Sequence, residues 1–225
     1  MKIVAISDMH GNYNFEVPKA DILIVAGDIV PLKMQRNISQ SFSWFKKKFI
    51  PWCQKLPVEQ VYLVAGNHDF FLEDSIKAKE CLLGTKITIL YNESSEYLDD
   101  DGKIWTIWGS PLCHIFGNWA FMRSDEYEKE KFSLIPNDLD ILITHDAAYG
   151  RNDVILGDSP WTDGRNIGNP ALAEVLKDKH PKYHFTGHLH TSDHNLVDYE
   201  GTLTACVSLL DERYEMTYKP LILEL

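Results

Sequence analysis

The sequence predicts an α/β protein in which two mixed β-sheets pack together between helices. Short apolar runs recur along the chain, and such runs are typical of strands that are covered on both faces. Segments with helical periodicity lie between several of these runs. Further short strands flank a glycine-containing turn, which indicates antiparallel pairing. With 225 residues, 44% of them hydrophobic, the chain is long enough to form one domain over residues 1–225.

The apolar runs predict the central strands, and the periodic segments predict the helices between them. The expected strands cover residues 3–6, 22–26, 61–65, 141–144 and 183–186. The expected helices cover residues 40–53, 74–81, 124–132 and 170–178. Asn169 is the expected N-cap of the last helix, with Pro170 at its first position, because an Asn side chain can accept a hydrogen bond from the first helical turn.

The remaining strands are expected to be antiparallel. Residues 96–98 and 103–107 flank the sequence Asp99-Asp100-Asp101-Gly102, which predicts a hairpin. Residues 202–207 and 220–224 are expected to complete the second sheet. The stretch 147–168 is rich in Gly, Asp and Asn and follows a polar strand end. We therefore expect a surface excursion that borders a functional site.

Composition excludes several classes of protein. Asp and Glu number 33 against 22 Lys and Arg, a net charge of -11, so non-specific nucleic-acid binding is not expected. The apolar runs are much shorter than the ~20 residues of a membrane-spanning helix. Met1 leads directly into the first strand, so no secretory signal is expected. The four cysteines are scattered and never form a CxxC motif, which predicts reduced thiols in a cytoplasmic protein.

Metal-ligating side chains follow all five central strands. An Asp after a strand is most often a turn residue or a helix cap, and a single His beside Gly is usually solvated. Five such strand ends in one chain are poorly explained by that interpretation, because ligands of open α/β sheets bind beyond the carboxyl ends of the strands. The ends are Asp8-Met9-His10, Gly27-Asp28, Gly66-Asn67-His68-Asp69, His145-Asp146 and Gly187-His188-Leu189-His190.

This set of donors predicts a hydrolytic centre with two metal ions. Carboxylate, amide and imidazole ligands without thiolate suit Mn²⁺, Fe or Zn²⁺, and the donors outnumber those that one ion takes from protein. Two neighbouring ions can bind a phosphoryl oxygen and lower the pKa of a water molecule. Asp28 lies at a middle strand end, so it is the carboxylate expected to bridge the ions.

The five blocks, in this order, resemble the signature of the calcineurin-like metallophosphoesterases over residues 2–206. The resemblance implies a four-layer α/β/β/α sandwich and attack by a hydroxide that bridges the metals. It implies that Asp8, His10 and His190 hold the first ion, that Asp28 bridges, and that Asn67, His145 and His188 complete the second. It also implies that His68 protonates the leaving oxygen or stabilises charge on the phosphoryl group, with Asp69 holding its imidazole.

Other segments resemble a subfamily of small metallophosphoesterase-domain-containing (MPPED-like) enzymes. These segments are Ile107-Trp108-Gly109-Ser110-Pro111, Gly117-Asn118-Trp119-Ala120-Phe121, Gly168-Asn169-Pro170-Ala171-Leu172 and Arg213-Tyr214. The resemblance implies hydrolysis of small phosphodiesters, cyclic nucleotides included, with Mn²⁺ favoured over Fe or Zn²⁺. Asp146-Ala147-Ala148 stands where related sequences often have Gly-Pro-Pro. This difference affects the expected shape of the adjacent substrate loop and not the metal centre.

Two other functions stay open at this stage: a phosphomonoesterase, protein phosphatases included, and a non-catalytic metal-binding scaffold. Asn12 is a candidate for binding a phosphate oxygen, and a turn role explains it equally well. His114 and Trp119 are candidates for lining a pocket, although core packing is the favoured interpretation of Trp119. His194 is expected to be a solvated loop residue.

Overall fold

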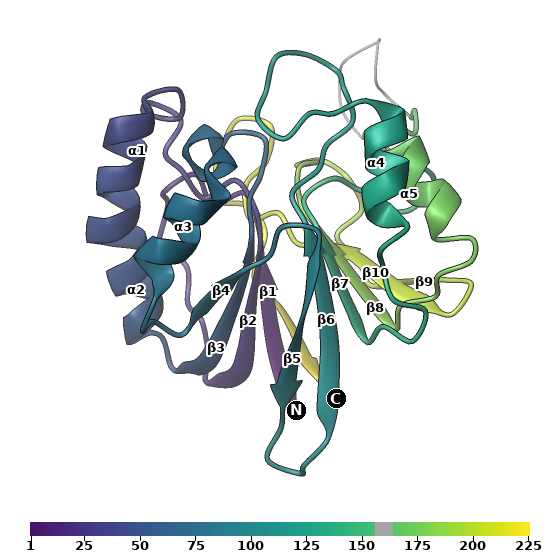
Figure 1. The fold of residues 1–225 in the computed structure, drawn as a ribbon, viewed down its shortest axis with the longest axis horizontal. Helices are drawn as coiled ribbons and strands as arrows, with labels where there is room; N and C mark the ends of the chain where they lie inside the picture. Colours follow the sequence, from purple (N-terminus) through teal and green to yellow (C-terminus); the bar gives the residue numbers. More distant parts are fainter. Residues whose placement is uncertain (156–163) are drawn as a thin grey trace.

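Two β-sheets lie face to face between two groups of helices in the computed structural model, which describes residues 1–155 and 164–225 (Figure 1). In order of pairing, the first sheet contains β11 (Leu221–Glu224), β1 (Lys2–Ile6), β2 (Ala20–Ala26), β3 (Val58–Val64) and β4 (Ile87–Ile89). The second contains β5 (Glu93–Leu98), β6 (Ile104–Ser110), β7 (Ile141–Thr144), β8 (Tyr183–Thr186), β10 (Thr202–Cys206) and β9 (Val197–Tyr199). Both sheets mix parallel and antiparallel pairs.

Helices cover the outer face of each sheet, as Figure 1 shows. The first sheet carries α1 (Ile38–Trp44), α2 (Ile50–Lys55) and α3 (Ser75–Leu82), and the second carries α4 (Asp125–Phe132) and α5 (Pro170–Val175). The N-cap of α5 is Asn169, whose Oδ1 accepts a hydrogen bond from the Leu172 amide at 3.0 Å. The predicted α/β/β/α sandwich of two mixed sheets is therefore confirmed.

Three apolar layers hold the four structural layers together. Val4 and Ile6 of β1 pack in the core beneath α1 and α2, whereas Ile3 and Ala5 of the same strand pack between the two sheets. Because both faces of β1 are buried, its sequence is continuously apolar rather than alternating. A third core, which contains Trp108, lies between the second sheet and its helices.

The structure corrects the expected ends of several elements. The segment 220–224, predicted for the second sheet, forms β11 and pairs antiparallel with β1 in the first sheet, with Val4 opposite Ile222. The predicted helix 40–53 contains a π-helical turn, Phe45–Phe49, between α1 and α2. The helix expected over 170–178 ends at Val175. The strands β4 and β9 were not predicted, because three residues are too few to show a periodicity.

The carboxyl ends of the central strands meet at the end of the molecule opposite the two termini (Figure 1). Parallel pairing of β1, β2 and β3, and of β6, β7 and β8, brings the loops after these strands to one side. A parallel bridge between Ser7 and Ser208 joins the two sheets there. No helix within residues 1–155 and 164–225 is long and apolar enough to cross a membrane.

Candidate metal centre

The strand ends carry the candidate ligands on unusual backbone. Asp8, His10, Asp28 and His188 have φ angles of 53°, 42°, 53° and 68°, in the left-handed region that non-glycine residues rarely adopt. Backbone hydrogen bonds between the loops maintain this geometry, from the Asp8 amide to the Gly27 carbonyl and from the His10 amide to the Asp28 carbonyl, each at 3.0 Å. Such strain persists where the surrounding structure holds it, and it is concentrated at functional sites.

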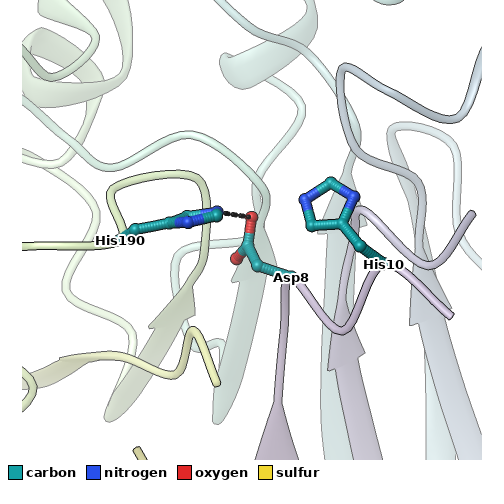
Figure 2. Close-up of side chains that lie close together, drawn as sticks. All are labelled: Asp8, His10 and His190. Atoms are coloured by element: carbon teal, nitrogen blue, oxygen red, sulfur yellow. Dashed lines mark hydrogen bonds and ion pairs between the residues drawn. The ribbon is translucent and has the colours of Figure 1, made fainter. Parts of the chain in front are cut away.

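The first cluster contains Asp8, His10 and His190, whose potential ligand atoms lie within 4.8 Å of one another (Figure 2). His190 Nε2 is 3.3 Å from Asp8 Oδ1. Burial raises the pKa of Asp8, but the hydrogen bond and charge of His190 outweigh it and hold that pKa below its usual range. Burial has the opposite effect on His190 and lowers its pKa. The hydrogen bond and charge of Asp8 outweigh burial and raise the pKa of His190 to about 9. The buried Asp8 carboxylate therefore stabilises positive charge beside it, and a bound metal ion could supply that charge.

Asp28 lies at the centre of the site, where it faces three imidazoles. Its Oδ2 is 3.5 Å from His145 Nε2 and 3.7 Å from both His10 Nε2 and His68 Nε2. It belongs to two further groups of potential ligands, one with His10 and His68 and one with Asp8 and His145. This central place suits a carboxylate shared between two ions.

Asn67, His145 and His188 lie on the other side of Asp28. Asn67 Oδ1 is 2.9 Å from His145 Nε2, and the His188 ring is 5.2 Å from the His145 ring between centroids. Burial lowers the pKa of His188 to about 4, which keeps its imidazole neutral and available as a ligand. The His188 amide also donates to Asp8 Oδ2 at 2.9 Å, so this loop supports the first cluster as well.

The hydrogen bonds of the imidazoles test whether these residues fit metal ions. His145 Nδ1 is 2.7 Å from the Ala26 carbonyl, and His190 Nδ1 is 2.8 Å from the Asp211 carbonyl. A carbonyl oxygen only accepts, so both Nδ1 atoms carry protons and both Nε2 atoms face the site, as in metal-ligating histidines. Buried His10 Nε2 has no hydrogen-bond partner among the described residues. The residues therefore fit divalent cations.

Asp69 does not hold the imidazole of His68, contrary to the role that the resemblance implied. Its carboxylate accepts hydrogen bonds from the backbone amides of Gly66, Val30 and Ile29 at 2.9, 3.0 and 3.3 Å. Burial, followed by the charge of Asp28, raises the pKa of this carboxyl to about 7. Asp69 therefore ties the loop after β2 to the loop after β3, because both of its oxygens are occupied by backbone amides.

His68 itself points into a cavity of about 280 Å³ that opens over the centre. Its Nδ1 hydrogen-bonds Gln35 Oε1, a partner that sequence reasoning missed because Gln35 lies in an irregular turn 33 residues away. Trp119, expected in the core, is half-buried, lines the cavity and lies 4.5 Å from the His68 ring between centroids. Phe116 and Tyr214 also line the cavity and were not predicted there.

Two other candidate residues lie in the loops that carry His10 and His190. Asn12 Oδ1 accepts a hydrogen bond from the Asn14 amide at 2.9 Å, and Asn12 is not among the described residues that line the cavity. This hydrogen bond agrees with the turn role, and phosphate binding by Asn12 stays a prediction. His194 is half-buried rather than solvated, and its ring stacks on Tyr218 with centroids 3.5 Å apart.

A polar network lies behind His188 and His145. Asp146 Oδ2 accepts hydrogen bonds from His114 Nδ1 at 2.7 Å, from the His114 amide at 3.1 Å and from Asn169 Nδ2 at 3.3 Å. The His114 ring is 5.6 Å from Phe116, whose ring is 5.1 Å from His188. Asp146 thus holds the loop that forms one wall of the cavity.

The same network contains Glu128, which predicts a dependence of stability on pH. Burial raises the pKa of Glu128 from 4.5 to about 7, with a smaller opposing effect of the hydrogen bond from Asn169. The folded protein therefore binds more protons than the unfolded chain between pH 4.5 and 7. The contribution of protonated Glu128 to the free energy of unfolding is lost as the pH rises through that window. Glu128→Gln is expected to raise the free energy of unfolding at pH 8 by about 2 kcal/mol.

Urea unfolding of both proteins at pH 5 and pH 8 measures this effect. The advantage of the variant is expected to shrink at pH 5, where Glu128 is protonated in the folded wild type. A variant that is less stable than the wild type at pH 8 would contradict the interpretation.

Comparisons with known proteins agree with this geometry. The family model of the calcineurin-like phosphoesterases matches residues 1–192. Metallophosphoesterase domain-containing protein 1 of Homo sapiens is 28% identical over 248 residues, which cover 100% of this chain and 71% of that protein. A UPF0046 protein of Caenorhabditis elegans is 27% identical over 233 residues, covering 99% of this chain and 74% of its own length.

Solved structures share the fold at low identity. The phosphopantetheinyl hydrolase of Mycobacterium tuberculosis has a TM-score of 0.58 at 14% identity and covers 95% of this chain and 90% of its own. Protein TT1561 of Thermus thermophilus has a TM-score of 0.56 at 13% identity, with 91% and 88% covered. Together with the family model, the fold and the convergence of ligands show that this chain belongs to the calcineurin-like phosphoesterase family and is a metal-dependent phosphoester hydrolase.

Proposed function

We propose that this phosphoesterase is a phosphodiesterase that acts in the cytoplasm on small phosphodiesters, cyclic nucleotides included. Two divalent ions serve the reaction, with Mn²⁺ favoured and Fe or Zn²⁺ as alternatives. Asp8, His10 and His190 would hold the first ion, Asp28 would serve both, and Asn67, His145 and His188 would hold the second. When bound, the ions polarise the phosphoryl oxygen and lower the pKa of the attacking water.

The charge of the cavity carries the proposal for diesters. Among the described residues that line it, none is Lys or Arg, and Glu212 adds a carboxylate to that of Asp28. A phosphate monoester carries about -1.5 to -2 charges at pH 7 because its second pKa is about 6, whereas a diester carries one. Bound divalent ions would offset much of the phosphate charge, but Glu212 opposes the second charge of a monoester more than the single charge of a diester, so the cavity is better suited to the diester.

The aromatic rim supports a substrate with two ester groups. Phe116, Trp119 and Tyr214 surround the cavity, and Phe116 is 48% exposed. Such faces can pack against an aryl group or a nucleobase on the ester oxygen that is not cleaved. His68 Nε2 lies 3.7 Å from Asp28 Oδ2, on the cavity side of the centre. From there it can donate a proton to the leaving oxygen.

The ratio of kcat/KM for bis(p-nitrophenyl) phosphate to that for p-nitrophenyl phosphate tests the proposal. We expect the diester to be preferred by about fivefold or more, because two like unit charges ~4 Å apart repel by about 1 kcal/mol even in bulk water. Glu212→Gln is expected to narrow the ratio about threefold by improving monoester binding. Glu215→Gln removes a nearby exposed carboxylate that does not line the cavity, so it serves as the matched control.

Preference for the monoester in the wild type would favour the phosphatase alternative instead. A ratio that responds equally to Glu212→Gln and Glu215→Gln would show that the carboxylate in the cavity does not select the substrate. Turnover that disappears in His68→Ala would exclude the non-catalytic scaffold.

A further inference from the structure

The His68 imidazole has two distinct sides. Its Nε2 faces the metal centre at 3.7 Å from Asp28 Oδ2, and the His68 amide donates to Asp28 Oδ1 at 2.8 Å. The ring lies beside Trp119, with centroids 4.5 Å apart, and meets His10 edge-on at 5.0 Å. These neighbours confine the ring and leave Nδ1 directed away from the centre.

Gln35 occupies the Nδ1 side. Its Oε1 hydrogen-bonds His68 Nδ1, and within residues 1–155 and 164–225 no other side chain hydrogen-bonds that nitrogen. An amide oxygen only accepts, so Nδ1 is the donor and carries a proton. The adjacent carboxylate of Asp69 cannot take this role, because its oxygens accept from three backbone amides.

The turn that carries Gln35 contacts both His68 and the loop of Trp119. Backbone hydrogen bonds from Met34 to Pro31 at 3.0 Å and from Asn37 to Met34 at 2.7 Å shape the turn. The next residue, Arg36, places its guanidinium 4.9 Å from the centre of the Trp119 ring and donates to the Asn118 carbonyl at 2.8 Å. Consecutive side chains of this turn therefore hold His68 and the loop of its aromatic neighbour.

We infer that Gln35 is a positioning residue for phosphoester cleavage: its amide oxygen fixes the His68 ring with Nδ1 protonated and Nε2 directed at the leaving oxygen. This inference rests on the proposed role of His68 beside the scissile bond. Gln35 provides an acceptor without negative charge, so the imidazole is oriented without a further anion close to an anionic substrate. Gln35 therefore contributes to the rate only by orienting His68, as hydrogen-bond partners of active-site histidines do.

The kinetic test is a double-mutant cycle of Gln35→Leu and His68→Ala in the metal-loaded protein. Gln35→Leu keeps much of the side chain and removes the acceptor, and it is expected to lower kcat about tenfold with KM nearly unchanged. The loss is expected to grow as the leaving phenol of the aryl ester becomes more basic. In the His68→Ala background, itself slower by about 10²–10⁴-fold, Gln35→Leu is expected to have no further effect.

Two further variants separate orientation from general damage. Gln35→Glu keeps an acceptor at Nδ1, so it is expected to retain more activity than Gln35→Leu. Gln40→Leu makes the same change at an exposed position of α1 and is expected to behave as wild type. Equal losses from Gln35→Leu in the presence and absence of the His68 imidazole would overturn the inference.

Nitrogen NMR of the metal-free protein gives a readout that does not depend on activity. The wild-type His68 ring is expected to be the Nδ1-protonated tautomer, and Gln35→Leu is expected to shift it toward a mixture of tautomers. A wild-type ring protonated at Nε2 alone would overturn the inference. If the enzyme prefers monoesters, the cycle is run with aryl monoesters, so failure of the diester proposal is distinguishable from failure of this one.

Discussion

Replacing Asp28 with Asn is expected to lower metal-dependent turnover by about 10³-fold or more. The Asp28 carboxylate faces His10, His68 and His145 and belongs to two groups of potential ligands, so its charge serves both halves of the site. An amide has nearly the same shape and can still accept from the His68 amide, so the fold is expected to survive. The measurement is kcat/KM together with metal content per chain.

Asp100→Asn is the matched control, because Asp100 is exposed in the turn between β5 and β6. It is expected to leave both turnover and metal content unchanged. An Asp28→Asn protein that retains wild-type turnover with its metal content verified would contradict a shared role for this carboxylate.

Gly187→Ala is expected to disrupt the site by a steric clash, without changing any charge. A Cβ at this position would meet Ser7 Oγ and the Asp8 carboxylate. Neither can move freely, because Ser7 Oγ donates to the Ala26 carbonyl at 2.9 Å and Asp8 Oδ2 accepts from the His188 amide at 2.9 Å. We expect a loss of about 2–4 kcal/mol in the free energy of unfolding and about 10–100-fold weaker metal binding.

Urea unfolding of the metal-free protein and metal titration measure the two effects of Gly187→Ala. Gly201→Ala is the comparison: Gly201 has a φ of +90°, and an added Cβ there would meet no atom of the described residues beyond its chain neighbours within 4 Å, so it incurs a backbone penalty without a steric contact. Metal affinity is expected to fall only at Gly187. Equal metal affinity in the two variants would show that close packing around Asp8 does not control the ligand geometry.

The convergence of the candidate ligand residues was predictable because each follows closely on a strand whose apolar run is visible in the sequence. Parallel pairing then brings these ends together, so Asp8, Asp28 and His145 converge without any further information. The layer order was predictable for the same reason, since strands buried on both faces require helices outside them.

The walls of the site were not predictable from local patterns. Gln35 and Phe116 lie in irregular segments, and their contacts depend on where the loops cross in space. Asp69 adjoins His68 in sequence, yet its carboxylate turns to the backbone amides of the loop after β2, because buried amides need acceptors. The pairing of β11 with β1 likewise depends on the path of the chain after β10, which a strand of four residues does not encode.

Titration of metal-stripped protein with Mn²⁺, followed by both bound metal and hydrolysis of bis(p-nitrophenyl) phosphate, tests the central claim most directly. The arrangement of ligands around Asp28 predicts that two ions bind per chain and that turnover appears as the second site fills. Full turnover with one ion bound, or diester hydrolysis that persists in the stripped protein, would contradict a phosphodiesterase built on a shared carboxylate.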